Sequence, residues 1–235
     1  MDQMQEPLII TVDGPAGSGK SSICQRVAER IGFTYVNTGA LYRSIAYLAS
    51  MEHIPLEDER GLCKLAESFH QYGQHDPDSG NIHYQGTLLN PYLYTEDLSW
   101  KASKIATSAP LREALLPVQR EWALKCRHGA LLDGRDTGTV VFPGAQLKIF
   151  LTASPEQRAY RRKIQLQTNQ PSAPEPDLSS LTEDLKRRDQ QDSQRETAPL
   201  RQAKDAIVLD SSDLTIEQTI EKMAGIIRDQ LGIPV

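Results

Sequence analysis

A short apolar run followed by a glycine-rich loop constrains this chain more than any other feature. Leu8–Asp13 has the composition of a buried strand, the next residues match GxxxxGK[ST], and an apolar helical pattern opens at Ser21. Glycine lets the backbone come close to a polyphosphate, and N–H groups at a helix N-terminus favour a bound anion. A glycine-rich turn that matches by chance would not explain the flanking strand and helix. The pattern predicts a nucleoside triphosphate site.

This segment, called the phosphate loop below, assigns separate roles to its residues. Lys20 can reach the phosphates, and the Ser21 hydroxyl is placed to hold Mg²⁺. We expect the triphosphate to lie against the whole loop, namely Gly14, Pro15, Ala16, Gly17, Ser18, Gly19, Lys20, Ser21 and Ser22.

Composition limits the partners of the chain. Its 235 residues suffice for one α/β domain with one or two small excursions. A net charge of −5 and a pI of about 5.6 argue against general affinity for nucleic acid or anionic membranes. The three cysteines show no CxxC pair, no basic leader opens the sequence, and no apolar stretch approaches about 18 residues. We expect a cytoplasmic monomer with small-molecule partners, no nucleic acid and no membrane.

Five short apolar runs alternate with helical stretches, as in a buried parallel sheet with crossover helices. We predict an α/β fold, a P-loop NTPase core with a five-stranded parallel sheet flanked by helices. The runs are Leu8–Val12, Phe33–Val36, Ala130–Leu132, Leu147–Leu151 and Ala206–Leu209. In the last helix Thr215 and Gln218 can form a capping box, and the apolar face is marked by Ile216, Ile220, Met223, Ile227 and Leu231.

Two stretches depart from this alternation. Residues 73–98 are polar and turn-rich, which predicts short antiparallel strands or a hairpin. Residues 158–195 contain a basic helix, a proline-rich link at 170–176 and a charged helix from Leu178. A proline-rich link between two arginine-bearing helices predicts a hinged lid. The alternative is a solvated helical hairpin without a role.

Two motifs follow predicted strands. In Asn37–Arg43, Thr38 and Arg43 could bind a second phosphate and Tyr42 could pack on a sugar or base; alternatively Thr38 caps a helix and Arg43 is exposed. The second motif, Asp133–Asp136, lies where open α/β folds bind ligands.

Within Asp133-Gly-Arg-Asp136 the chemistry favours binding over proton transfer. Phosphoryl transfer to a phosphate depends mainly on positioning and charge neutralisation. We therefore interpret Arg135 as a phosphate clamp and Asp136 as a recognition carboxylate. The alternative is an Asp-Gly turn with an internal ion pair.

Arginines gather in the predicted lid. Arg158 and Arg162 are four residues apart, and Arg188, Asp192 and Arg195 fall at i, i+4 and i+7 on one predicted helix face. Several guanidinium groups suit a migrating phosphoryl group. The alternative is an intrahelical Arg188–Asp192 pair of a few tenths of a kcal/mol.

Taken together, these motifs make the chain resemble the bacterial cytidylate kinases, a family of nucleoside monophosphate kinases. The resemblance covers nearly the whole length and is most specific in the block that begins at Asp133. It rests on DGPAGSGK (13–20), TGALYR (38–43), LREALL (111–116), DGRDTGTVVFP (133–143), KIFL (148–151) and APL (198–200). Thr38 departs from the pattern, because the similar proteins carry serine there.

The resemblance implies Mg²⁺-dependent transfer of the ATP γ-phosphoryl group to CMP or dCMP, giving CDP or dCDP and ADP. It also implies one kinase domain over 1–235, with a core at about 1–38, 99–157 and 196–235, a nucleoside-monophosphate region at 39–98 and a lid at 158–195.

By itself, Ser103 or Arg112 would be taken for a helix-surface residue. The implied roles are cytosine recognition by Ser103, Arg112, Asp136 and Arg195, sugar contacts by Tyr42, Arg188 and Asp192, acceptor-phosphate contacts by Thr38, Arg43 and Arg135, and lid arginines Arg158 and Arg162.

Base chemistry fits this assignment. A carboxylate can accept from cytosine N4, and arginine can donate to the ring acceptors. Uracil reverses these donors and acceptors, and such mispairing can lower kcat/KM about 10⁴-fold. A UMP/CMP kinase of broader base tolerance remains the alternative, as does a non-catalytic ATP-binding regulator. A GTPase would need an Asn-Lys-x-Asp motif, which the sequence lacks.

Overall fold

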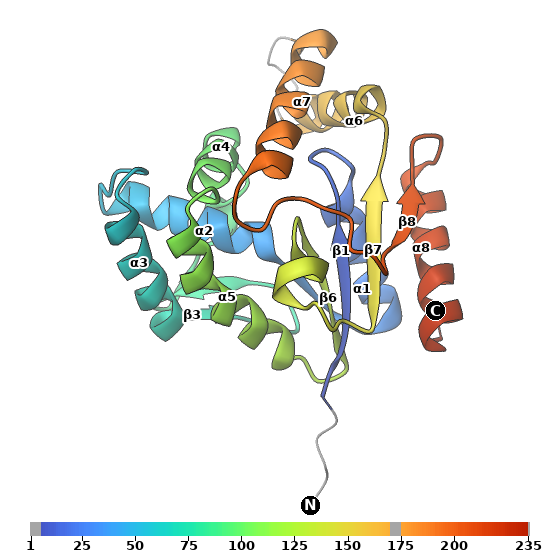
Figure 1. Ribbon diagram of the computed structural model, residues 1–235, viewed down its shortest axis with the longest axis horizontal. Helices are drawn as coiled ribbons and strands as arrows, with labels where there is room; N and C mark the ends of the chain where they lie inside the picture. Colours follow the sequence, from blue (N-terminus) through green and yellow to red (C-terminus); the bar gives the residue numbers. More distant parts are fainter. Residues whose placement is uncertain (1–5, 170–174, 235) are drawn as a thin grey trace, which may run out of the picture. The chain divides into compact units, whose positions relative to one another are not determined.

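The main sheet of the molecule confirms the predicted α/β fold. The computed structural model describes residues 6–169 and 175–234. Within them, five strands form a parallel sheet of order β2-β6-β1-β7-β8 (Figure 1). Each predicted run forms a strand, with ends shifted by at most two residues. The strands are β1 (Leu8–Asp13), β2 (Thr34–Asn37), β6 (Gly129–Gly134), β7 (Leu147–Thr152) and β8 (Ile207–Asp210).

Burial explains why the strand sequences are so apolar. All six residues of β6 are buried, as are the last five of β1. Strands covered on both faces need continuous apolar runs instead of an alternating pattern. The register places Ile10 opposite Leu147 and Ile149 opposite Ile207.

The chain divides into two compact units. Unit 1 contains the chain up to Ile9 and Gly32–Leu132, and unit 2 contains Ile10–Ile31 and the chain from Asp133 onward. Strands β1 and β6 contribute residues to both units.

Unit 1 is built from helices and a small antiparallel sheet. The sheet, of order β3-β4-β5, confirms the antiparallel strands predicted between residues 73 and 98. In this unit α2 packs against α3 and α4, and α3 packs against α5. Its elements are α2 (Thr38–Met51), α3 (Glu59–Tyr72), β3 (Gly73–His75), β4 (Ile82–Tyr84), β5 (Thr87–Leu88), the 3₁₀ turn η1 (Asn90–Tyr92), α4 (Glu96–Ile105) and α5 (Ala109–Leu124).

Unit 2 carries the phosphate loop and the predicted lid helices. In it α1 packs against α8, and α6 packs against α7 (Figure 1). Residues 170–174, most of the predicted proline-rich link, lie outside the described residues, as do residues 1–5 of the predicted leaderless N-terminus. The helices are α1 (Lys20–Ile31), the π-helix η2 (Thr137–Val141), α6 (Pro155–Asn169), α7 (Leu178–Gln194) and α8 (Ile216–Leu231).

The last helix tests the prediction at single residues. Its capping box is confirmed, since Gln218 N donates to Thr215 Oγ1 at 3.1 Å and Thr215 N donates to Gln218 Oε1 at 2.9 Å. The placement of Ile216 on the apolar face was wrong, because Ile216 is 42% exposed. It is the first residue of α8, and burial begins one turn further on, at Thr219.

No helix in the described part of the chain is both long enough and apolar enough to span a membrane.

Candidate active site

The phosphate loop connects β1 to α1, as predicted, and needs its glycines. Gly14 has φ +155°, and a Cβ there would lie 2.0 Å from the carbonyl oxygen of Leu151 on β7. Gly17 has φ +76°, in the left-handed region that other residues rarely adopt. The close approach to β7 therefore excludes any side chain at position 14.

Lys20 is wrapped by the loop that precedes it. Its ammonium donates to the carbonyl oxygens of Gly14 and Pro15, both at 2.7 Å, and to Ser18 Oγ at 3.2 Å. The side chain is buried, and burial together with the positive charge of Arg135 lowers the pKa of Lys20 to about 7. A polyphosphate beside this ammonium would favour its charged form.

Ser21 faces a carboxylate from a distant strand. Its hydroxyl donates to Asp133 Oδ2 at 2.6 Å, and Asp133 lies at the end of β6. Hydroxyl and carboxylate oxygens are hard ligands suited to Mg²⁺, which usually keeps waters and phosphate oxygens in its remaining positions. Within residues 6–169 and 175–234 the structure contains no group of three or more His, Cys, Asp or Glu that could hold a metal ion.

Sequence reasoning gave Asp133 no role of its own. The available signal was a carboxylate directly after the apolar run Ala130–Leu132, near the carboxyl end of a fully buried strand.

Asp13 ties the end of β1 to the segment that follows Asp136. Its carboxylate accepts hydrogen bonds from the backbone N–H and the hydroxyl of Thr137 and from the N–H of Gly138, each at 2.8 Å. Burial raises the pKa of Asp13, and these three hydrogen bonds oppose that rise. Thr137 begins the π-helix η2, an element that often marks functional sites. No motif in the sequence indicates this contact.

Arg135 and Asp136 each meet a charged residue from the predicted lid. Arg135 Nε donates to Asp192 Oδ2 at 2.9 Å, and an Arg195 terminal nitrogen lies 3.6 Å from Asp136 Oδ1. Burial would raise the pKa of Asp192, but Arg135, Arg188 and Arg195 outweigh it and hold this pKa below its usual value. The structure thus joins Arg135, Asp136, Asp192 and Arg195 in one buried cluster of alternating charge.

This cluster corrects one prediction. Arg135 and Asp136 have charged partners on distant segments, beyond the Asp-Gly turn. Arg195 does not continue the helix face of Arg188 and Asp192, because α7 ends at Gln194 and Arg195 is extended, with φ −60° and ψ 142°. Its guanidinium still reaches Asp192 Oδ1 at 3.9 Å, and its Nε donates to the carbonyl oxygen of Ala198 at 2.6 Å.

The predicted lid arginines lie in unlike surroundings. Arg158 is buried and donates to the carbonyl oxygens of Ala153 at 3.0 Å and Ala16 at 2.9 Å. Arg162 is half-buried and donates to Gln165 Oε1, one helical turn along, at 2.8 Å. The structure therefore brings Arg158 to the phosphate loop, and Arg162 donates to a residue of its own helix.

Arg161 was not predicted as a site residue. Its guanidinium donates to the carbonyl oxygen of Ser18 at 3.1 Å, to Ser211 Oγ at 3.0 Å and to the carbonyl oxygens of Ser211 and Leu214 at 2.6 and 3.2 Å. It therefore ties the phosphate loop to the turn between β8 and α8.

The remaining candidates lie in unit 1, where α2 begins directly after β2. Asn37, not Thr38, caps this helix, since Asn37 Oδ1 accepts from Ala40 N at 3.0 Å. The capping role suggested for Thr38 was wrong, because Thr38 is the first helical residue and the cap precedes it. Arg43 is half-buried instead of exposed, with its guanidinium 5.1 Å from the ring centroid of Tyr94.

Arg112 and Tyr42 are brought together in unit 1. The guanidinium of Arg112 lies 5.4 Å from the Tyr42 ring centroid and donates to the carbonyl oxygen of Ala106 at 3.1 Å. Both side chains are buried, so Arg112 is no ordinary helix-surface residue. Ser103 lies on α4 and is half-buried.

Comparisons with known proteins decide the family. The family model described as Cytidylate kinase matches residues 10–229. The chain belongs to the cytidylate kinase family. A curated cytidylate kinase of Pseudomonas fluorescens (strain Pf0-1) is 42% identical, covering 95% of this chain and 97% of its own. One of Alkaliphilus oremlandii (strain OhILAs) is 40% identical, covering 93% and 97%.

Structural similarity adds no argument of its own. A shikimate kinase structure from Bacteroides thetaiotaomicron is 13% identical with a TM-score of 0.46, covering 96% of this chain and 98% of that chain. A likeness at this level supports no statement about function.

In this member of the cytidylate kinase family the candidate residues form three groups within their units. The phosphate loop with Asp133, Arg158 and Arg161 is one group, and the cluster around Asp192 is the second; both belong to unit 2. The third group belongs to unit 1 and lies on α2, α4 and α5.

Proposed function

We propose that this cytidylate kinase family member transfers the γ-phosphoryl group of ATP to CMP or dCMP, giving ADP and CDP or dCDP. The observation that carries the proposal is the family match over residues 10–229, supported by two curated cytidylate kinases at 40% identity or more. Both names favour CMP over the broader UMP/CMP alternative. We further propose that the protein acts as a cytoplasmic monomer.

On the donor side we assign ATP to the phosphate loop. Lys20 would stabilise charge on the β- and γ-phosphates through the transition state. Ser21 and Asp133, whose oxygens lie 2.6 Å apart, would hold Mg²⁺. A bound Mg²⁺ would neutralise charge on the β- and γ-phosphate oxygens. Arg158, which already contacts the loop, would add a guanidinium to this side, with Arg162 as a second lid arginine.

On the acceptor side we assign the nucleoside monophosphate to the residues that the family resemblance implies. A carboxylate that accepts from cytosine N4 and guanidinium groups that donate to the ring match this base and mismatch uracil. The ion pairs of Arg135 with Asp192 and of Arg195 with Asp136 would keep these groups in place before the substrate arrives. The proposed contacts are Ser103, Arg112, Asp136 and Arg195 to the base, Tyr42, Arg188 and Asp192 to the sugar, and Thr38, Arg43 and Arg135 to the phosphate.

We propose that α6 and α7 form the lid and that residues 39–98 form the nucleoside-monophosphate region. The core would then comprise residues of about 1–38, 99–157 and 196–235. Hydrogen exchange tests the lid. Between Arg158 and Arg195 exchange should be fast in the free protein and slow when CMP and a non-hydrolysable ATP analogue bind together. Equal protection with and without ligands would make α6 and α7 a static hairpin.

A coupled assay of ADP formation tests the function. CMP, dCMP, UMP, AMP and GMP are compared side by side with ATP and Mg²⁺, and kcat/KM is measured for each. The proposal predicts CMP and dCMP as the best acceptors. A best value for AMP or GMP would refute it, equal values for UMP and CMP would favour the broader kinase, and no turnover would favour a non-catalytic ATP-binding regulator.

A further inference from the structure

A carboxylate on α7 reaches two groups that the proposed function assigns to phosphate. Asp189 Oδ1 accepts from the backbone N–H of Ala16 in the phosphate loop at 3.2 Å. Its other oxygen, Oδ2, accepts from the Arg158 guanidinium at 2.5 Å. The Asp189 side chain is 23% exposed and that of Arg158 only 5%. The motifs in the sequence did not single out Asp189.

Both donors are of the kind that binds polyphosphate. Backbone N–H groups of a glycine-rich loop before a helix form an anion site. An arginine donates strong, charge-assisted hydrogen bonds to carboxylate and phosphate oxygens alike. The carboxylate of Asp189 therefore makes, with Ala16 and Arg158, contacts that a phosphate group could make.

Close packing fixes the carboxylate in this position. Ala16 forms a buried apolar cluster with Ala159 of α6 and Leu185 of α7. A Cβ on Gly17 would lie 3.3 Å from Arg158 Cβ and 3.4 Å from Leu185 Cδ1, so the two helices leave little free space over the loop. Asp189 follows Leu185 by one helical turn and is aimed at the loop by the same packing.

We propose that Asp189 is a positioning residue that competes with nucleotide phosphate for the Ala16 N–H and the Arg158 guanidinium. The proposal rests on the proposed function, since it presumes that the loop binds ATP and ADP. While Asp189 holds Arg158, this guanidinium stays ordered beside the loop. An incoming phosphate must displace the carboxylate, which lowers nucleotide affinity, and its return assists ADP release.

The direction in which nucleotide affinity changes when Asp189 is substituted distinguishes a competing carboxylate from a structural ion pair. Loss of a structural pair would weaken nucleotide binding, because the loop and Arg158 would be less well placed. Loss of a competitor strengthens it. Arg158 still donates to the carbonyl oxygens of Ala153 and Ala16 after Asp189 is changed, so the buried guanidinium keeps acceptors.

The experiment measures ADP affinity of the full chain by isothermal titration calorimetry. Asp189→Asn keeps the shape and removes the charge, and Asp189→Ala is the second variant if the first folds poorly. Asp184→Asn is the matched control, because Asp184 is an exposed carboxylate on the same helix, paired with Arg187. Asp189→Glu keeps the negative charge of the carboxylate.

We expect the Kd of ADP to fall about tenfold in Asp189→Asn and Asp189→Ala, which corresponds to about 1.4 kcal/mol. KM for ATP should fall as well without a rise in kcat, while Asp184→Asn and Asp189→Glu stay near the wild-type values. An unchanged or higher Kd in both neutral variants would overturn the competition while leaving the proposed function intact. A wild-type protein that binds neither ADP nor ATP would overturn both.

Discussion

The two units hold their candidate residues by different physical means. In unit 2, charged side chains are joined to distant segments by ion pairs and hydrogen bonds, as in Arg135 with Asp192 and Asp13 with Thr137. In unit 1, the candidate arginines lie over aromatic rings, Arg112 over Tyr42 and Arg43 over Tyr94. Removing one member of a buried charged pair leaves the other uncompensated and costs about 3–5 kcal/mol, whereas a cation–π contact contributes about 0.5–2 kcal/mol. Substitutions should therefore have larger effects in unit 2.

The largest effect is expected at the phosphate loop. Lys20→Ala should lower kcat about 10³-fold, because a charge aimed at the transferred phosphoryl group is removed. Circular dichroism should stay native, and Lys222→Ala, which removes an exposed lysine on α8, should turn over normally. Near-normal turnover in Lys20→Ala would break the assignment of the donor side to unit 2.

The next effect concerns the stability of unit 2. Asp13→Ala removes the acceptor for three buried donors on Thr137 and Gly138, and should lower the free energy of unfolding by about 3 kcal/mol. Urea denaturation monitored by circular dichroism measures this loss. A loss below about 1 kcal/mol, the net value of an ordinary hydrogen bond, would mean that the contact does not hold β1 and η2 together.

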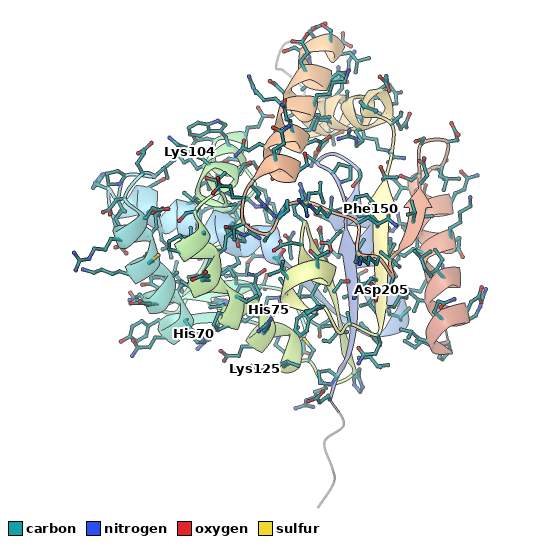
Figure 2. The ribbon with its side chains drawn as sticks, in the orientation of Figure 1. His70, His75, Lys104, Lys125, Phe150 and Asp205 are labelled. Atoms are coloured by element: carbon teal, nitrogen blue, oxygen red, sulfur yellow. The ribbon has the colours of Figure 1, made fainter. Side chains whose placement is uncertain are left out.

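Unit 1 carries a histidine that the fold keeps neutral. His75 on β3 (Figure 2) stacks on Trp122 at 4.8 Å between ring centroids, and burial lowers its pKa from 6.5 to about 4. Well above pH 6.5 the His75 imidazole is unprotonated in both the folded and the unfolded chain. Between pH 6.5 and 4 the unfolded chain takes it up first, so stability falls as pH falls, by about 3 kcal/mol at most.

Urea denaturation of wild type and His75→Phe between pH 7 and pH 4 isolates the contribution of His75 to the pH dependence of stability. Carboxylates contribute to the pH dependence of both proteins, so the difference in slope is the quantity of interest. We expect the shallower slope in His75→Phe. Equal slopes would show that the imidazole is accessible to protons in the folded protein.

The smallest effect is expected at the start of α2. Asn37→Ala removes the cap of the helix that carries Thr38, Tyr42 and Arg43 and should cost about 1 kcal/mol of stability. Asn37→Ser should recover most of it, since serine also caps. A loss as large as that of Asp13→Ala would remove the expected contrast between the two units.

The sequence predicted the local features and missed the long-range contacts. Apolar runs located all five strands of the sheet, and the Thr215–Gln218 pattern located a capping box, because each is recorded in neighbouring residues. The contact between Ser21 and Asp133 joins positions 112 apart, and that between Ala16 and Asp189 joins positions 173 apart. No spacing rule records such contacts, since chain topology creates them.

The errors at Thr38, Arg195 and Ile216 lie at helix ends, where a shift of one residue exchanges a cap for a helical position.

Transfer of a phosphoryl group from ATP to CMP is the activity that we propose for this chain. Phosphorus-31 NMR of the full protein with ATP, Mg²⁺ and CMP follows donor and acceptor in one sample. We expect CDP and ADP to form in equal amounts, with inorganic phosphate released no faster than by ATP hydrolysis without protein. Inorganic phosphate with no CDP, or unchanged ATP in the presence of CMP, would contradict it.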